Sequence, residues 1–142
     1  MLFRSVHATE QNPARLGATN AGLAQYLDPA STFGKQAFSA LGSEELREAL
    51  EAAGCEHLLL AGIEVPVCLY QTAVEARRGE MDVTVLADCV SGRRAEDFPP
   101  VYDELRDAGA HLLPSETVFY SLVGSAEHPQ FRAYTGLVKE YA

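Results

Sequence analysis

The sequence is poor in basic residues, in cysteine and in long apolar runs. It has 11 Lys and Arg against 20 Asp and Glu in 142 residues, a net charge of -9. This balance disfavours nucleic acid and anionic membranes as partners, because phosphate groups are bound by clustered Lys and Arg. No apolar run is long enough to span a bilayer, and the start, Met1 to His7, is too short and polar for a signal peptide.

The three cysteines, Cys55, Cys68 and Cys89, are odd in number, and their spacing fits no zinc motif. A reducing, cytoplasmic setting accounts for them most simply. The length, with 47% hydrophobic and 22% charged residues, indicates one globular domain over residues 1–142 that forms its core without disulfides or metal.

Segments typical of strands alternate with segments typical of helices, which predicts an α/β fold with a mostly parallel sheet. Ser43 and Ser115 are expected to cap helices, and Pro66 suits a first helical turn. The Leu-rich run 57–63 predicts a strand covered on both faces. The expected strands are 2–9, 57–63, 81–87 and 111–113, with a polar loop at 10–22 and helices at 24–27, 43–53, 66–78, 99–108, 115–122 and 129–141.

Cys68 occupies the position best suited to chemistry. It lies on the first turn of a helix that directly follows the strand 57–63, and sites in such folds lie at the carboxyl ends of strands. A helix N-terminus favours the thiolate form of a cysteine, and its free amides can bind an oxyanion. The competing interpretation is a small buried apolar residue. Cys55 is interpreted as structural, and Cys89 as packing more than as pocket lining.

A cation near Cys68 would favour its thiolate, and a carboxylate could accept its proton. Lys35, before Phe38 and Ser39, is the best candidate cation, although an ordinary exposed lysine is the alternative. Glu64 and Asp88 stand at strand ends, where a pocket carboxylate and a hydrogen-bonded turn residue are both reasonable roles. No Gly-rich phosphate loop follows a strand, so a flavodoxin-like nucleotide binder is disfavoured.

Several stretches together resemble the isochorismatase-like cysteine hydrolases, in particular the small isochorismatase domain-containing branch. The resemblance covers nearly the whole chain and implies a three-layer α-β-α fold. The matching stretches are Thr9-Glu10-Gln11-Asn12-Pro13, Leu16-Gly17, Lys35-Gln36-Ala37-Phe38-Ser39, Leu60-Ala61-Gly62-Ile63-Glu64 with Cys68, Gln71-Thr72-Ala73, Val83 to Asp88 with Ser91 and Arg93, Gly109-Ala110, Ser115-Glu116 and His128-Pro129-Gln130-Phe131.

The resemblance implies a catalytic Asp, Lys and Cys, with Cys68 as nucleophile and Lys35 as the lysine. It also implies a non-proline cis peptide between Ile63 and Glu64, which turns an amide toward the oxyanion beside the amide of Cys68. Phe38, Ile63 and Glu64 would then border the substrate, a small amide, carbamoyl compound or relative. No cofactor is implied, and the ligands of the zinc-binding branch have no counterparts here, so no metal is expected.

The sequence departs from the family pattern at Val65, where threonine is usual, and at Pro66. Family members also begin with a strand and helix that carry the catalytic Asp, and Asp28 is a poor substitute for it. Because that strand is central in the family's sheet, its loss would leave unpaired edges. We therefore expect either a truncated reading frame or a homo-oligomer in which neighbouring copies complete the sheet. The alternative to a hydrolase is a catalytically impaired assembly or small-molecule binding module.

Overall fold

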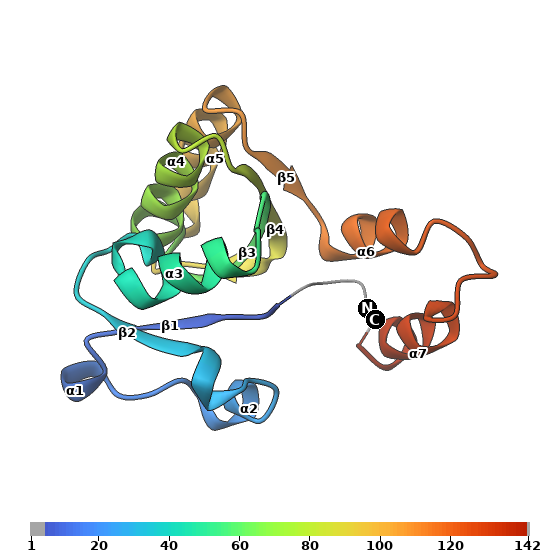
Figure 1. Cartoon of the computed structure of the whole chain (residues 1–142). Helices are drawn as coiled ribbons and strands as arrows, with labels where there is room; N and C mark the ends of the chain where they lie inside the picture. Colours follow the sequence, from blue (N-terminus) through green and yellow to red (C-terminus); the bar gives the residue numbers. More distant parts are fainter. Residues whose placement is uncertain (1–4, 142) are drawn as a thin grey trace.

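The structure, a computed structural model, describes residues 5–141. Its strands form two parallel sheets rather than one (Figure 1). In the first, β1 (Ala8–Gln11) pairs with β2 (Thr32–Lys35). In the second, β4 (Asp82–Ser91) lies between β3 (His57–Ile63) and β5 (His111–Leu113). Within the described residues no hydrogen bonds join β1 or β2 to β3, so β3 is an edge strand.

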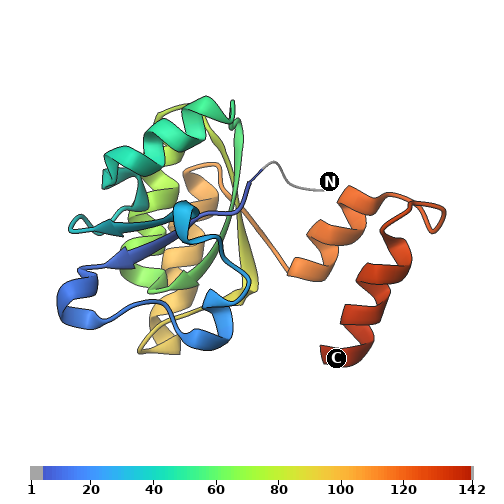
Figure 2. The ribbon, with the colours of Figure 1, turned by 60° about the horizontal axis from the view of Figure 1, so that its bottom comes forward.

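Helices flank the strands and complete a three-layer α/β fold, as the sequence predicted. In Figure 2, α3, α4 and α5 lie on one side of β3 and β4, and α6 and α7 lie on the other. The helices are α1 (Pro13–Leu16), α2 (Ala21–Ala24), α3 (Glu44–Ala52), α4 (Tyr70–Arg78), α5 (Phe98–Asp107), α6 (Ser115–Val123) and α7 (Phe131–Tyr141), with short turns η1 (Pro29–Ser31), η2 (Ala40–Gly42), η3 (Val65–Leu69) and η4 (Ala95–Asp97). None of them is long and apolar enough to cross a membrane.

The core lies between β4 and helices α3, α4 and α5. Val83 and Val85 of β4 and Leu105 of α5 are completely buried, and Ala73 and Ala76 bring α4 close to the strand. Burial of each large apolar side chain stabilises the fold by about 1.5–3 kcal/mol. The best-packed part of the molecule is therefore the part that supports the ends of β3 and β4.

Most element boundaries agree with the sequence predictions, and the N-terminal ones do not. Helix α3 begins after Ser43, whose hydroxyl accepts the amide of Leu46 at 3.4 Å, as predicted. The strand predicted at 2–9 is Ala8–Gln11, with its predicted residues 2–4 outside the described part. The predicted loop 10–22 contains α1, and α2 precedes the turn predicted at 24–27. These short elements have no clear apolar periodicity, so their bounds are hard to predict from the sequence.

The strand β3 has its predicted bounds, yet it is not covered on both faces as predicted. Leu58, Leu59 and Leu60 are only half-buried, and Ile63 is 71% exposed. The physical reason is that β3 pairs with β4 along one edge and has no partner along the other within the described residues. A Leu-rich strand indicates that its side chains favour burial. The sequence of the strand does not indicate which neighbouring element buries them.

Ser115 does not cap α6 as predicted; it is the first residue of the helix and is itself held by Asp88. The Asp88 carboxylate accepts hydrogen bonds from the Ser115 amide and hydroxyl, both at 2.7 Å. The Ser115 hydroxyl is the largest cause that lowers the pKa of Asp88. This carboxylate therefore ties the start of α6 to the end of β4.

We expect Asp88→Ala to loosen the start of α6, because the Ser115 amide loses its acceptor. Amide exchange of Ser115 and Val118 should accelerate by about fivefold or more, as measured by NMR. Asp103→Ala, which removes a surface carboxylate paired with Arg106 on α5, is the matched control and should leave these amides unchanged.

Acid should likewise lower the protection of these amides in the unmodified chain, measured relative to the intrinsic exchange rate at each pH. Because the pKa of Asp88 is lowered on folding, its stabilisation is complete above the ordinary aspartate value of about 4 and is lost as the pH falls through the lowered value. Exchange at Ser115 that does not respond to either change would contradict this role.

Candidate active site

Cys68 lies where the sequence placed it, in the turn η3 that joins the end of β3 to α4. Glu64 precedes this π-helical turn, and its carbonyl accepts the amides of Val67 at 3.2 Å and Leu69 at 3.1 Å. The intervening amide of Cys68 does not bond that carbonyl. The peptide between Ile63 and Glu64 is cis. The half-buried thiol of Cys68 thus sits beside backbone amides at the start of a helix.

Thr72 fixes the turn that carries Cys68. Its buried hydroxyl donates to the Cys68 carbonyl at 2.6 Å and accepts the amide of Ala40 at 2.8 Å. One side chain therefore joins the first turn of α4 to the segment that follows β2. Thr72 lies within one of the matching stretches of the sequence, but the sequence alone does not indicate this role.

Lys35, at the end of β2, is a buried lysine and not an exposed one; its relative exposure is 7%. The ammonium donates to the Gln11 side-chain oxygen at 2.5 Å and to the carbonyls of Ala37 at 2.9 Å and Phe38 at 2.8 Å. An ammonium has three donors, so all are used. No hydrogen bond joins Lys35 to Cys68 among residues 5–141; the link between them runs through residues 37–40 and Thr72.

Two further predicted site residues, Phe38 and Ile63, are on the surface. Phe38 is 53% exposed and Ile63 is 71% exposed, so both can contact a ligand, but neither is enclosed by the described residues. Asp28 accepts the amide of Ala30 at 2.9 Å and caps η1. Glu64 and Asp88 are both hydrogen-bonded, which fits the turn-residue interpretation of each.

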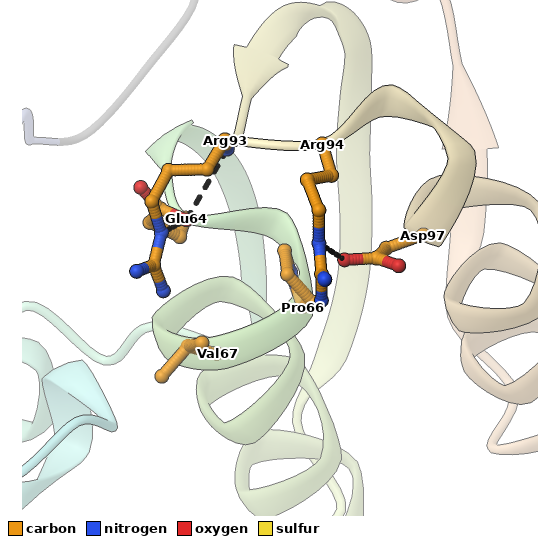
Figure 3. A pocket seen from close by; sticks show the side chains of 6 residues that line it. All are labelled: Glu64, Pro66, Val67, Arg93, Arg94 and Asp97. Carbon is orange, nitrogen blue, oxygen red and sulfur yellow. Dashed lines mark hydrogen bonds and ion pairs between the residues drawn. The ribbon is translucent and has the colours of Figure 1, made fainter.

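A cavity of about 400 Å³ opens beside the turn η3, between the ends of β3 and β4 (Figure 3). Two ion pairs lie on its wall: Arg93 Nε donates to Glu64 at 3.1 Å, and Arg94 Nε donates to Asp97 at 2.8 Å. Cys68 itself does not line it. The lining residues are Glu64, Pro66, Val67, Arg93, Arg94 and Asp97.

Sequence reasoning missed the two arginines as site residues, although Arg93 lay in a matching stretch. The only signal was their place directly after β4, at the same sheet end as Cys68. The remaining cysteines are separate from this region in their contacts: Cys55 donates to the His57 carbonyl, and exposed Cys89 approaches the Asp88 carboxylate at 3.7 Å. Cys89 is therefore not the packing residue that the sequence favoured. The described residues contain no cluster of three His, Cys, Asp or Glu side chains able to hold a metal.

A three-layer α/β fold with a cysteine on the turn after a parallel strand fits the class of isochorismatase-like folds. Comparison with family models agrees: the model described as the isochorismatase domain matches residues 5–117. The chain belongs to the isochorismatase family.

Curated relatives include isochorismatase domain-containing protein 2 of Bos taurus, 37% identical over 134 residues, and that of Xenopus laevis, 34% identical over 134 residues. These matches cover 93% and 94% of this chain but only 63% and 64% of the relatives. Among solved structures, a ribonuclease named MAR1 from Caenorhabditis elegans has a TM-score of 0.83 at 32% identity, over 92% of this chain and 67% of its own. The chain thus spans about two thirds of these proteins.

We expect Lys35→Met to destabilise the fold, because the carbonyls of Ala37 and Phe38 lose a charged donor while Gln11 loses its partner. The expected loss in free energy of unfolding is about 1–3 kcal/mol, measured by urea denaturation. The chain's other lysine, exposed Lys139, provides the control, and Lys139→Met should change stability by less than about 0.5 kcal/mol. Equal effects of the two substitutions would show that the buried contacts of Lys35 contribute nothing measurable.

Proposed function

We propose that the chain is a cysteine-dependent hydrolase that acts on a small amide, carbamoyl compound or related substrate, with Cys68 as the nucleophile. Membership of the isochorismatase family supports hydrolysis in general. The single observation that carries the finer proposal is the position of Cys68, on the first turn after β3, where the amide of Cys68 itself is not bonded to the Glu64 carbonyl. Such a position favours a thiolate and an oxyanion together.

In the proposed reaction the Cys68 thiolate adds to the substrate carbonyl carbon. The carbonyl oxygen takes the negative charge and is held by the amides of Glu64 and Cys68. Collapse of this intermediate breaks the bond to the leaving nitrogen, which takes up the proton that the thiol released. Water then attacks the thioester, the acid leaves, and the thiol is restored.

Lys35 serves this reaction as a fixed positive charge. Its three donors are held by Gln11, Ala37 and Phe38, so a direct bond to the thiolate or the substrate would require one of them to be exchanged. The bond to the Gln11 side chain is the one that can change without moving the backbone. Phe38 and Ile63 would border the substrate, since both are exposed on the segments that carry Lys35 and Glu64.

We further propose that neighbouring copies complete the sheet. The strands β1 and β3 each have one partner, so each leaves an edge free within the described residues. Unpaired strand edges recruit further strands, and the apolar side chains of β3 are only half-buried. The assembly would enclose the side of the site on which Ile63 is exposed. A cytoplasmic setting stays a prediction, in keeping with three unpaired cysteines.

A ribonuclease activity, the one named for the Caenorhabditis elegans neighbour, is not proposed for this chain. The net charge of -9 opposes the approach of a phosphate backbone. The arginines nearest to the site, Arg93 and Arg94, are each already paired with a carboxylate.

We expect iodoacetamide to label Cys68 near pH 7 faster than it labels Cys89, although Cys89 is the more exposed thiol. Burial and the negative charge of Asp88 raise the pKa of Cys89, so the two thiols form an internal comparison. Labelling is read by mass spectrometry of the peptides, with Cys68→Ala as control.

Labelling of Cys68 only above about pH 8.5, the value of a free thiol, would contradict a nucleophilic role. Specific binding of a small amide without turnover, unchanged by Cys68→Ala, would favour the binding module instead.

We expect the chain to sediment as a dimer or larger assembly at micromolar concentration, because association would pair the free edges of β1 and β3. Amide exchange of β3 should slow as the concentration rises, whereas the interior strand β4 should not respond. A monomer at all concentrations, with β3 protected as strongly as β4, would rule out completion of the sheet between chains.

A further inference from the structure

Glu64 has three separate roles in the proposed site, one each for its amide, its carbonyl and its carboxylate. Its amide belongs to the cis peptide with Ile63, its carbonyl holds the turn that carries Cys68, and its carboxylate binds Arg93. Both contacts to the carboxylate come from Arg93: the backbone amide at 3.3 Å and Nε at 3.1 Å reach the same oxygen. Figure 3 shows this pair on the β4 side of the turn.

The charge of Glu64 is a difficulty for the proposed chemistry. A carboxylate next to a thiolate or an oxyanion disfavours both, since like charges at short range raise the free energy of the charged state. Glu64 is also the residue whose amide would bind the oxyanion, so its side chain cannot be far from the reacting atoms. The site therefore needs a counter-charge that holds this carboxylate in one direction.

We propose that Arg93 is a positioning residue of the active site: it draws the Glu64 carboxylate toward the end of β4 and neutralises it, so that Cys68 and the oxyanion face amides and not a free negative charge. This rests on the proposed role of Cys68 as nucleophile. The second ion pair, between Arg94 and Asp97, is local to the start of α5 and leaves Arg93 as the partner of Glu64.

The register of the sheet explains why Arg93 can do this. Ile63 pairs with Ser91 at the carboxyl ends of β3 and β4. Glu64 directly follows Ile63 and Arg93 stands two residues after Ser91, so the two residues leave the sheet close together and the Arg93 amide reaches the Glu64 carboxylate. The side chain of Glu64 is 25% exposed while that of Arg93 is 80% exposed. The arginine thus covers the carboxylate from the solvent side.

Few other charged groups lie close enough to the turn to affect the charge of Cys68. The turn η3 packs against β3, α4 and α5, and later charges on α4 and α5 lie a turn or more farther along each helix. The titratable groups next to the turn on these elements and their connecting loop are Glu64, Tyr70, Arg93, Arg94, Glu96, Asp97 and Tyr102. Buried Lys35 is the other charge to count, since residues 37–40 and Thr72 link it to the turn.

The test is the pH profile of Cys68 alkylation by iodoacetamide in the full chain, followed at the Cys68 peptide by mass spectrometry. Arg93→Gln should move the midpoint upward by roughly half a pH unit, about a threefold slower rate near pH 7. Glu64→Gln should move it downward by a similar amount, and Glu64→Gln with Arg93→Gln should return it near the unmodified value. Arg78→Gln, at the far end of α4 and exposed, removes the same charge and should have no effect.

An electrostatic effect predicts opposite shifts of the midpoint in the two single variants and a return to the unmodified value in the double variant. Loss of structure would not produce this pattern. Arg93→Lys should retain most of the effect, because the amide contact and the charge persist. Shifts of the same sign, or a double variant no better than Arg93→Gln, would overturn the proposal. If the unmodified Cys68 itself reacts only as a free thiol, the proposed function fails instead, so the two failures are distinguishable.

Discussion

The parallel pairing of β3 with β4 is the constraint on which the rest of the structure depends. β4 supplies the completely buried Val83 and Val85, and its register aligns Ile63 with Ser91. This alignment brings the turn that carries Cys68 next to the loop that carries Arg93. On the other side of β4, Asp88 holds the start of α6. One strand therefore positions the turn of Cys68, the loop of Arg93 and, on its far side, the helical layer of α6 and α7, and the two helical layers lie on opposite sides of it in Figure 2.

Much of this arrangement could be predicted from the sequence where the signal is local. The strand 57–63, the helix ended by Gly79 and the place of Cys68 follow from an apolar run, a proline and a glycine, and the structure confirms them. The partner of Glu64 could not be predicted in this way, because Arg93 is 29 residues away and exposed. The burial of Lys35 likewise depends on Gln11, 24 residues earlier. Local patterns place elements, whereas hydrogen-bond partners are set by how the elements pack.

The two sheets are separate, so the parts of the chain that carry Lys35 and Cys68 are not joined by strand pairing. Lys35 lies at the end of β2, whereas Glu64 and Cys68 lie in the turn that follows β3. These two parts are joined through η2 and Thr72 and not through strand pairing; Figure 1 shows the two sheets apart. The curated relatives are longer than this chain by about a third of their own length. The distance between lysine and cysteine thus depends on helical packing and on whatever pairs with the free edges of β1 and β3.

The most direct measurement of the central claim is covalent trapping of an acyl group on Cys68. The full chain is mixed with an activated ester such as p-nitrophenyl acetate, quenched at intervals in acid, and examined by intact and peptide mass spectrometry. If Cys68 is the nucleophile, a thioester forms on Cys68 first and then decays as water attacks it, with none on Cys55 and none in Cys68→Ala. An acyl group that collects on Cys89, or that never appears on Cys68, would contradict Cys68 as the nucleophile.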